Sequence, residues 1–182
     1  MRRFPAMAGP VDPHQFRDAC GHFATGVCVV TSLGAEGPSG MTANAVSSLS
    51  LDPPLMIVCF ALTSRTLAAV QHSRSFGVQF LAHGQDEIAA RFASKLPERE
   101  KFDGVAWRER AGVPSINGCL AWLGCELQEL YPGGDHQIGV GEVVDLWEVA
   151  GNPLVFFRGD YWSLTQRTQA PPEVDQALEG PG

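Results

Sequence analysis

The sequence predicts a mainly β protein, an antiparallel barrel with two or three short helices packed outside it. Short stretches rich in β-branched and aromatic residues recur along the chain, and turns rich in Gly and Pro separate them. Helical periodicity is confined to a few short segments between these stretches. The 182 residues fit one domain with a core of its own. We expect a folded domain over 14–166, with a mobile arm at 1–13 and a disordered tail at 167–182.

The first half of the chain alternates between expected helices and strands. A helix is predicted from His14, because four apolar residues recur at the spacing of one helical face, namely Phe16, Ala19, Cys20 and Phe23. Strands are expected at 26–32, in a hairpin with the stretch that follows it, and then at 55–61 and 76–81. Two more short helices are expected at 65–72, with Leu67 and Val70 inward, and at 85–94.

The second half reads as successive strands after one charged segment. Residues 95–114 are the most charged and least periodic part of the chain, and we expect a long surface loop there. Apolar and polar residues alternate over 123–130, which is typical of a half-buried strand. Further strands are expected at 136–147, 154–158 and 161–164, which brings the expected number to seven or eight.

Composition excludes several classes of function. The formal net charge of −7 argues against a nucleic-acid partner, which requires a basic face. No apolar run approaches the ~20 residues of a membrane span, so no membrane partner is expected. The five cysteines are odd in number and form no C-x-x-C pair, which favours a reducing cytoplasm over a disulfide framework.

The start of the helix expected at 65–72 is a candidate anion site. A helix N-terminus presents free N–H groups and a partial positive charge, which suit a phosphate. Thr63, Ser64 and Thr66 add hydroxyl groups, and Arg65 adds a guanidinium fork. The alternative is an ordinary N-cap, because Ser and Thr are preferred there in any surface helix.

A polar stretch precedes this helix start at 40–50. It is rich in hydroxyl and amide side chains, which are Thr42, Asn44, Ser47, Ser48 and Ser50. Such groups need hydrogen-bond partners if they are buried, and a planar heterocycle with carbonyls and ring nitrogens would supply them. A hairpin with its polar face in water is the alternative. One flat polar ring carrying one phosphate would need both this stretch and the helix start.

A third candidate is the pair Asp135 and His136, which follows a Gly-rich turn at the start of a strand. The imidazole could contact a nicotinamide or carry a proton, or the two side chains could form a solvated pair. The five histidines lack the spacing of metal ligands, so no metal is expected. The chain has neither a G-x-S-x-G elbow nor a G-x-G-x-x-G turn, which excludes a serine-hydrolase elbow and a Rossmann site.

Six segments in order resemble the flavin reductase family, the small NAD(P)H:flavin oxidoreductase components of two-component monooxygenases. They are FRDACGHFATGVCVVTS, GMTANAVSSLSLDPPLMIVC, the Ser-Arg-Thr helix start, the Lys101–Phe102 pair, YPGGDHQIGVGEV and PLVFFRGDYWSL. The resemblance covers about residues 16–164. It implies an FMN-binding split β-barrel (a Greek-key antiparallel barrel), a homodimer, and FMN or FAD as the flavin. It also implies NADH or NADPH as co-substrate and release of reduced flavin to a monooxygenase.

The resemblance also implies roles for individual residues. Thr42, Ala43 and Asn44 would lie along the isoalloxazine edge, with Ser47 and Ser48 nearby. Cys59 and Phe60 would lie beneath the ring, and Ser64, Arg65 and Thr66 would hold the phosphate. His136 would lie close to the nicotinamide beside Asp135, and Lys101 and Phe102 would give a supporting contact. Two other functions stay open: an oxidase that retains its flavin on the same barrel, and a non-enzymatic flavin- or haem-binding module.

Overall fold

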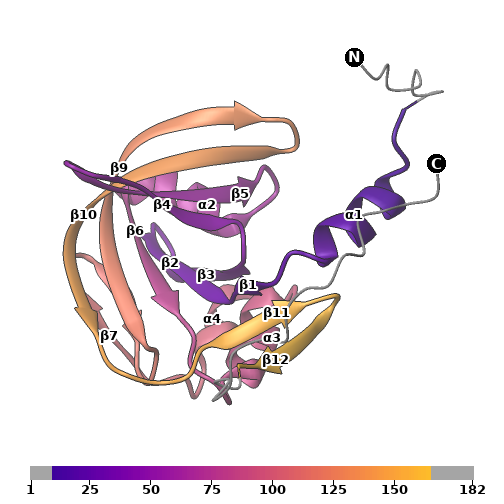
Figure 1. The fold of residues 1–182 in the computed structure, drawn as a ribbon. Coiled ribbons are helices and arrows are strands. Elements are labelled where there is room, and N and C mark those ends of the chain that lie inside the picture. Colours follow the sequence, from indigo (N-terminus) through magenta and orange to yellow (C-terminus); the bar gives the residue numbers. More distant parts are fainter. Residues whose placement is uncertain (1–9, 165–182) are drawn as a thin grey trace, which may run out of the picture.

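A curled seven-stranded antiparallel sheet dominates the computed structural model, which describes residues 10–164 (Figure 1). Its strands run in the order β3-β2-β6-β9-β10-β5-β4. Strands β3 and β4 lie at opposite ends of this order although they follow each other in the chain, so the sheet closes into a barrel with a split between them. The mainly β prediction is confirmed. The expected tail at 167–182 and residues 1–9 of the expected arm lie outside the described residues.

Twelve strands and four helices are present within residues 10–164, more than the sequence predicted. The seven strands of the barrel are β2 (Cys28–Gly34), β3 (Gly37–Ala43), β4 (Val46–Leu51), β5 (Pro54–Ala61), β6 (Ser75–Phe80), β9 (Ala121–Gly133) and β10 (His136–Glu148). Two smaller sheets add β1 (Thr25–Gly26), β11 (Leu154–Phe157), β12 (Asp160–Ser163), β7 (Trp107–Arg110) and β8 (Val113–Ile116). The helices are α1 (Pro13–Gly21), α2 (Arg65–Ser73), α3 (Asp86–Ala93) and α4 (Glu98–Phe102).

The barrel interior is filled by aromatic and β-branched side chains. Phe60 and Phe76 are fully buried and pack edge to face, with ring centroids 6.0 Å apart. Two glycines of β10 leave room for these rings. A Cβ at Gly139 would lie 2.7 Å from Phe60 Cε2, and one at Gly141 would lie 2.4 Å from Phe76 Cζ. The GVG sequence, which lacks the third glycine of a nucleotide-binding turn, is therefore a packing feature of the core.

Helix α2 forms where the sequence predicted it, with Leu67 and Val70 buried. Helix α1 also forms, but it projects away from the barrel and none of its residues is buried (Figure 1). Phe16, on its expected apolar face, is 63% exposed. The amphipathic period therefore predicted the helix correctly, but this face does not pack against the barrel of its own chain. None of the described helices is long and apolar enough to cross a membrane.

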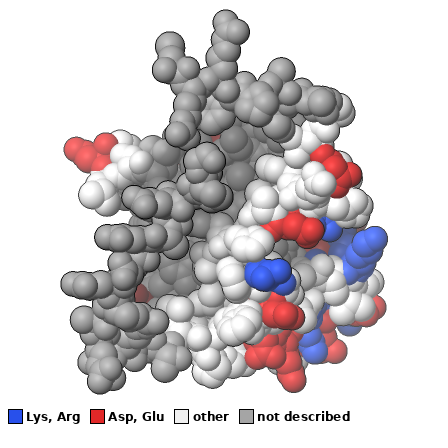
Figure 2. Space-filling view, turned by 45° about the vertical axis from the view of Figure 1, so that its right-hand side comes forward, with Lys and Arg blue, Asp and Glu red and all other residues white. Residues whose placement is uncertain are grey.

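The charged segment 95–114 is not the surface loop that the sequence predicted. It contains the short helix α4 and the β7–β8 hairpin, and Lys101 and Phe102 are buried. Strand β8 is buried along its whole length. The prediction is wrong because it rested on the many charged residues of the segment. The few apolar residues among them, such as Phe102, pack in a second core cluster with Phe92. On the described part of the face shown in Figure 2, acidic and basic side chains are interspersed.

Candidate functional site

The start of helix α2 has the geometry of an N-terminus with free donors. Ser64 is the N-cap in extended conformation, and its Oγ accepts a 3.4 Å hydrogen bond from the N–H of Leu67. The same Oγ lies 3.3 Å from Met41 Sδ at the end of β3. Among the described residues, no acceptor is found for the N–H groups of Arg65 and Thr66. Two backbone donors therefore remain free beside the arginine.

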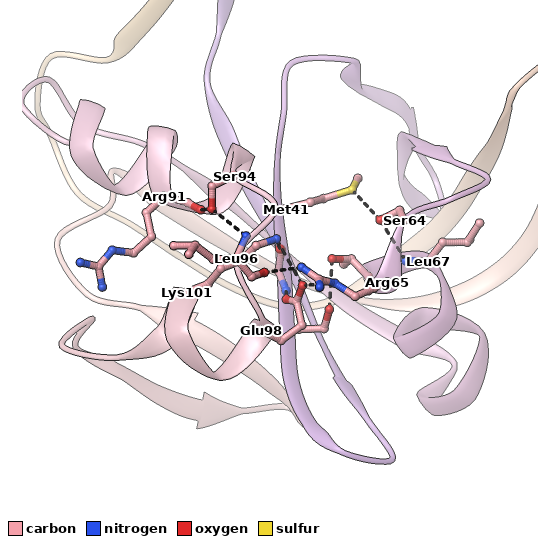
Figure 3. Close-up of polar contacts among 12 residues, drawn as sticks. Met41, Ser64, Arg65, Leu67, Arg91, Ser94, Leu96, Glu98 and Lys101 are labelled. Carbon is pink, nitrogen blue, oxygen red and sulfur yellow. Dashed lines mark hydrogen bonds and ion pairs between the residues drawn. The ribbon is translucent and has the colours of Figure 1, made fainter.

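Arg65 is held at one edge of its guanidinium and exposed at the other. Its Nε lies 2.9 Å from Glu98 Oε1, and one terminal nitrogen donates to the carbonyl oxygen of Leu96. Its side chain is nevertheless 51% exposed. Figure 3 shows Arg65 reaching from the start of α2 to Glu98 on the neighbouring segment. The remaining N–H groups of the guanidinium are available to an anion.

Thr66, the third member of the expected phosphate set, does not face solvent. It is 1% exposed, and its Oγ1 lies 3.2 Å from Ser39 Oγ in a hydrogen bond inside the molecule. Its hydroxyl is therefore engaged in the core, and only its backbone N–H can take part in anion binding. Within the expected phosphate set, Arg65 therefore offers exposed side-chain N–H groups to an anion, whereas Thr66 offers only its backbone N–H.

The polar stretch at the split of the barrel is partly exposed. Thr42 donates a 2.6 Å hydrogen bond to the carbonyl oxygen of Ala89 in α3, so its hydroxyl can only accept a further bond. Ala43 is half-buried against the core, whereas Asn44, Ser47 and Ser48 are exposed. This stretch leads directly from β3 into β4 and therefore borders the split.

Strand β5 runs under the same region. The N–H of Cys59 donates a 3.0 Å hydrogen bond to the carbonyl oxygen of Ala45, which brings the end of β5 against the start of β4. Cys59 is half-buried, but the ring of Phe60 is fully buried and points into the barrel. Of these two residues, Cys59 can offer a side chain to a ligand, and Phe60 can offer only its backbone.

Asp135 and His136 adjoin the helix start across the sheet. His136 opposes Ala61 at the end of β5, and the N–H of Leu62 donates a 3.0 Å hydrogen bond to the carbonyl oxygen of Asp135. His136 Nδ1 lies 2.7 Å from Asp135 Oδ1. This hydrogen bond and the imidazole charge hold the pKa of Asp135 below its ordinary value. With Nδ1 oriented by the carboxylate, the opposite ring nitrogen is available to a ligand.

Lys101 and Phe102 support the site from beneath. Lys101 is 5% exposed; its Nζ donates a 3.0 Å hydrogen bond to the carbonyl oxygen of Gly40 and lies 3.2 Å from Glu98 Oε1. Phe102 packs edge to face on Phe92, with centroids 5.0 Å apart. Lys101 therefore holds α4 against β3 and Phe102 packs α4 against α3, and neither side chain lines the exposed surface of the site.

Glu98 and Gly40 complete this contact and were not identified from the sequence. Glu98 Oε2 accepts a 2.8 Å hydrogen bond from the N–H of Gly40, and a Cβ at Gly40 would lie 2.6 Å from Phe92. The available signal was the i, i+3 spacing of Glu98 and Lys101, a pattern of opposite charges on one helical face. Because a loop was predicted at 95–114, this helical spacing carried no meaning there.

The unpaired and exposed polar groups together fit a ligand that carries both a phosphate and a polar ring. The free N–H groups of Arg65 and Thr66, with the exposed edge of the guanidinium, suit phosphate oxygens. Asn44, Ser47 and the available nitrogen of His136 offer further hydrogen-bonding groups nearby. Within residues 10–164, no group of three or more His, Cys, Asp or Glu side chains could hold a metal ion.

Comparisons with known proteins identify the family of the chain. Residues 20–165 match the model of the flavin reductase like domain. The chain is 37% identical over 177 residues to a flavin-dependent monooxygenase reductase subunit, HsaB, of Mycobacterium tuberculosis, covering 95% of this chain and 94% of the relative. It is 43% identical over 147 residues to an NADH-dependent FAD reductase of Streptomyces globisporus, covering 76% and 78%.

A solved structure extends the likeness to three dimensions. The Streptomyces globisporus NADH:FAD oxidoreductase in complex with NAD and FAD fragments superposes with a TM-score of 0.77 at 36% identity. The superposition covers 92% of this chain and all of the other. The matches cover 78% to 100% of the length of these relatives. The chain therefore belongs to the flavin reductase family.

Proposed function

We infer that this chain is an NADH-dependent flavin reductase that delivers reduced flavin to a flavin-dependent monooxygenase. Relatives of 37–43% identity carry these activities in their names, as the reductase subunit of a monooxygenase and as an NADH-dependent FAD reductase. The observation that carries the inference within this chain is the start of α2. There, two free N–H groups and a half-exposed Arg65 form an anion site beside the polar split of the barrel.

The residues at this site have distinct roles in the proposal. Arg65, Ser64 and the N–H of Thr66 bind the flavin phosphate. Thr42, Ala43 and Asn44 follow the polar edge of the ring, with Ser47 and Ser48 beside them, and Cys59 and the backbone of Phe60 lie beneath it. Lys101 and Phe102 act indirectly, because Lys101 holds α4 against β3 and Phe102 packs α4 against α3. Either FMN or FAD satisfies this set, since both carry the phosphate that Arg65 would bind.

The flavin supplies the hydride-accepting chemistry when it is bound, and the protein supplies orientation. His136 contacts the nicotinamide through the ring nitrogen that Asp135 does not engage. Asp135 is fully solvated at its outer edge, with 93% of its side chain exposed, so its role is to orient the imidazole. Holding donor and acceptor in contact is the main contribution expected of these side chains. No protein acid or base is required for the transfer.

We propose that the protein acts as a homodimer in the cytoplasm. The exposed apolar side chains of α1, including Phe16 at 63%, leave a face that a second subunit could cover. The five cysteines are free thiols, which would suit a reducing compartment. Sedimentation of the purified protein would distinguish a dimer from a monomer directly.

The test of the proposed function is NADH oxidation in air by the purified protein, with and without added FMN or FAD. A diffusible-flavin reductase turns over only when free flavin is present in catalytic amounts, and the better flavin identifies the cofactor. An oxidase would instead retain its flavin through purification and would respond little to added FMN. A haem-binding carrier would show a Soret band and no turnover. Either of these results would contradict the reductase function.

A further inference from the structure

Glu98 makes more polar contacts at the candidate site than any residue that the sequence singled out there. Its Oε2 accepts a 2.8 Å hydrogen bond from the N–H of Gly40 in β3. Its Oε1 lies 3.2 Å from Lys101 Nζ and 2.9 Å from Arg65 Nε. One carboxylate therefore joins the barrel edge, helix α4 and the start of helix α2 (Figure 3).

The carboxylate is itself fixed in place. Its side chain is 19% exposed, and the side chain of Lys101, its partner one turn along α4, is 6% exposed. Lys101 is in turn bound to the carbonyl oxygen of the same Gly40. Glu98 and Lys101 thus bind both polar groups of a single backbone residue. A carboxylate held at this many points can restrict the motion of a longer, exposed side chain that binds to it.

Arg65 is such a side chain. A free arginine has many rotamers, and ordering it on ligand binding opposes the binding. Here Glu98 and the carbonyl oxygen of Leu96 hold one edge of the guanidinium, and the other edge remains exposed. We propose that Glu98 is a positioning residue that orients Arg65 for the flavin phosphate. The proposal rests on the assignment of Arg65 to that phosphate.

Glu98 also places a negative charge near an anionic ligand, which opposes binding. This repulsion acts across the guanidinium, at a half-exposed position where water and salt screen it. The ordering of Arg65 is a direct contact effect that screening does not remove. We therefore expect the positioning effect to dominate, so that loss of the carboxylate weakens binding of the phosphate-bearing flavin.

The experiment compares two flavins that differ only in the phosphate. FMN and riboflavin are titrated against the Glu98→Gln variant, and binding is followed by flavin fluorescence without NADH. The dissociation constant for FMN should rise by about tenfold, and that for riboflavin should stay within about twofold, because only FMN uses Arg65. In NADH turnover, the KM for FMN should rise by more than kcat falls. The Glu100→Gln variant removes the same charge from an exposed position of the same helix and should bind FMN as the wild type does.

A double variant tests whether Glu98 acts through Arg65. In the Arg65→Ala background, Glu98→Gln should cause no further loss of FMN affinity. Unchanged or tighter FMN binding by Glu98→Gln would overturn the proposal, and so would an equal loss for riboflavin or an additive loss in the double variant. If the wild type binds FMN and riboflavin equally well, the phosphate assignment of Arg65 fails first, and the proposal fails with it.

Loss of Glu98 also leaves the buried Lys101 without its carboxylate partner, which can lower stability. The Glu98→Gln/Lys101→Met variant removes both charges and provides a second version of the test. Its thermal unfolding is measured without flavin, alongside the FMN and riboflavin titrations. A selective loss of FMN affinity in this variant supports the positioning role, and equal losses for the two flavins contradict it.

Discussion

Replacing Gly141 with alanine should destabilise the barrel because the added methyl group has no space. It would lie 2.4 Å from Phe76 Cζ and 2.9 Å from Cys125 Cβ. Carbon contacts are normally about 3.5–4.0 Å, so the ring would have to move by about 1 Å or more. Phe76 is fully buried against Phe60, and β10 is held by β5 on one side and β9 on the other. Overpacking of this kind costs about 1–3 kcal/mol.

Urea unfolding of Gly141→Ala, monitored by tryptophan fluorescence, measures this cost. A loss of about 2 kcal/mol should also lower the Tm by about 4–8 °C in a domain of this size. Gly26→Ala is the matched control, because a Cβ at Gly26 meets nothing within 4 Å and its backbone is not left-handed. That variant should lie within about 0.5 kcal/mol of the wild type.

A second substitution tests whether the clash with Phe76 is the cause. Phe76→Leu shortens the side chain that the new methyl group would meet, so the double variant should lose less stability than the sum of the single variants. Strictly additive losses would show that the two positions do not interact. A Gly141→Ala variant as stable as the wild type would refute the packing argument itself.

Three further predictions concern charge, thiols and catalysis. Arg110 binds both oxygens of Asp145, at 2.6 and 2.7 Å, and holds the pKa of that carboxyl below its ordinary value. The stabilisation is therefore complete at neutral pH and is lost as the pH falls through the lowered pKa. Wild type and Asp145→Asn should differ in urea stability at pH 7, and the difference should begin to shrink as the pH falls below about 4. At pH 8 a thiol reagent should label only Cys20 and Cys59 in the folded protein, because burial raises the pKa of the other three cysteines to about 12. FMN should slow the labelling of Cys59 and leave Cys20 unaffected; equal protection of both would place the flavin elsewhere. His136→Ala should lower kcat with NADH by about tenfold without abolishing turnover, the effect of one lost hydrogen bond of about 1.4 kcal/mol. Steady-state constants equal to those of the wild type would remove His136 from the site.

The parts of the fold that the sequence predicted are those with strong local periodicity. Helix α2 and its N-cap follow from a polar start and a regular apolar face, and the β2–β3 hairpin follows from a β-branched run before a Gly-rich turn. The juxtaposition of residues 135–136 with the start of α2 does not follow from any local pattern. It depends on the pairing of β10 with β5, a contact between segments far apart in the chain.

Side-chain direction was the harder part of the site to predict. The nearly continuous apolar run of β5 hides an alternation in which Phe60 faces the core and Cys59 does not. Thr66 begins the inward face of α2, four residues before the buried Val70, and this spacing could have indicated that its hydroxyl is not exposed. Glu98 was missed for a different reason: its contact with Lys101 has a local signal in the i, i+3 spacing, but its contacts with Gly40 and Arg65 join it to two other elements and have no such signal.

The contacts of Gly40 also bear on whether strand β3 can pair with a strand of another molecule. Strand β3 is the last strand at one end of the sheet, and residues 37–43 carry no charged side chain that would discourage pairing with a foreign strand. The side chains of Glu98 and Lys101 occupy the N–H and the carbonyl oxygen that such a strand would use at Gly40. An incoming strand would have to separate this buried ion pair before it could extend the sheet. Helix α4 therefore protects the barrel edge from intermolecular β-pairing. The residues of β3 alone would not prevent such pairing.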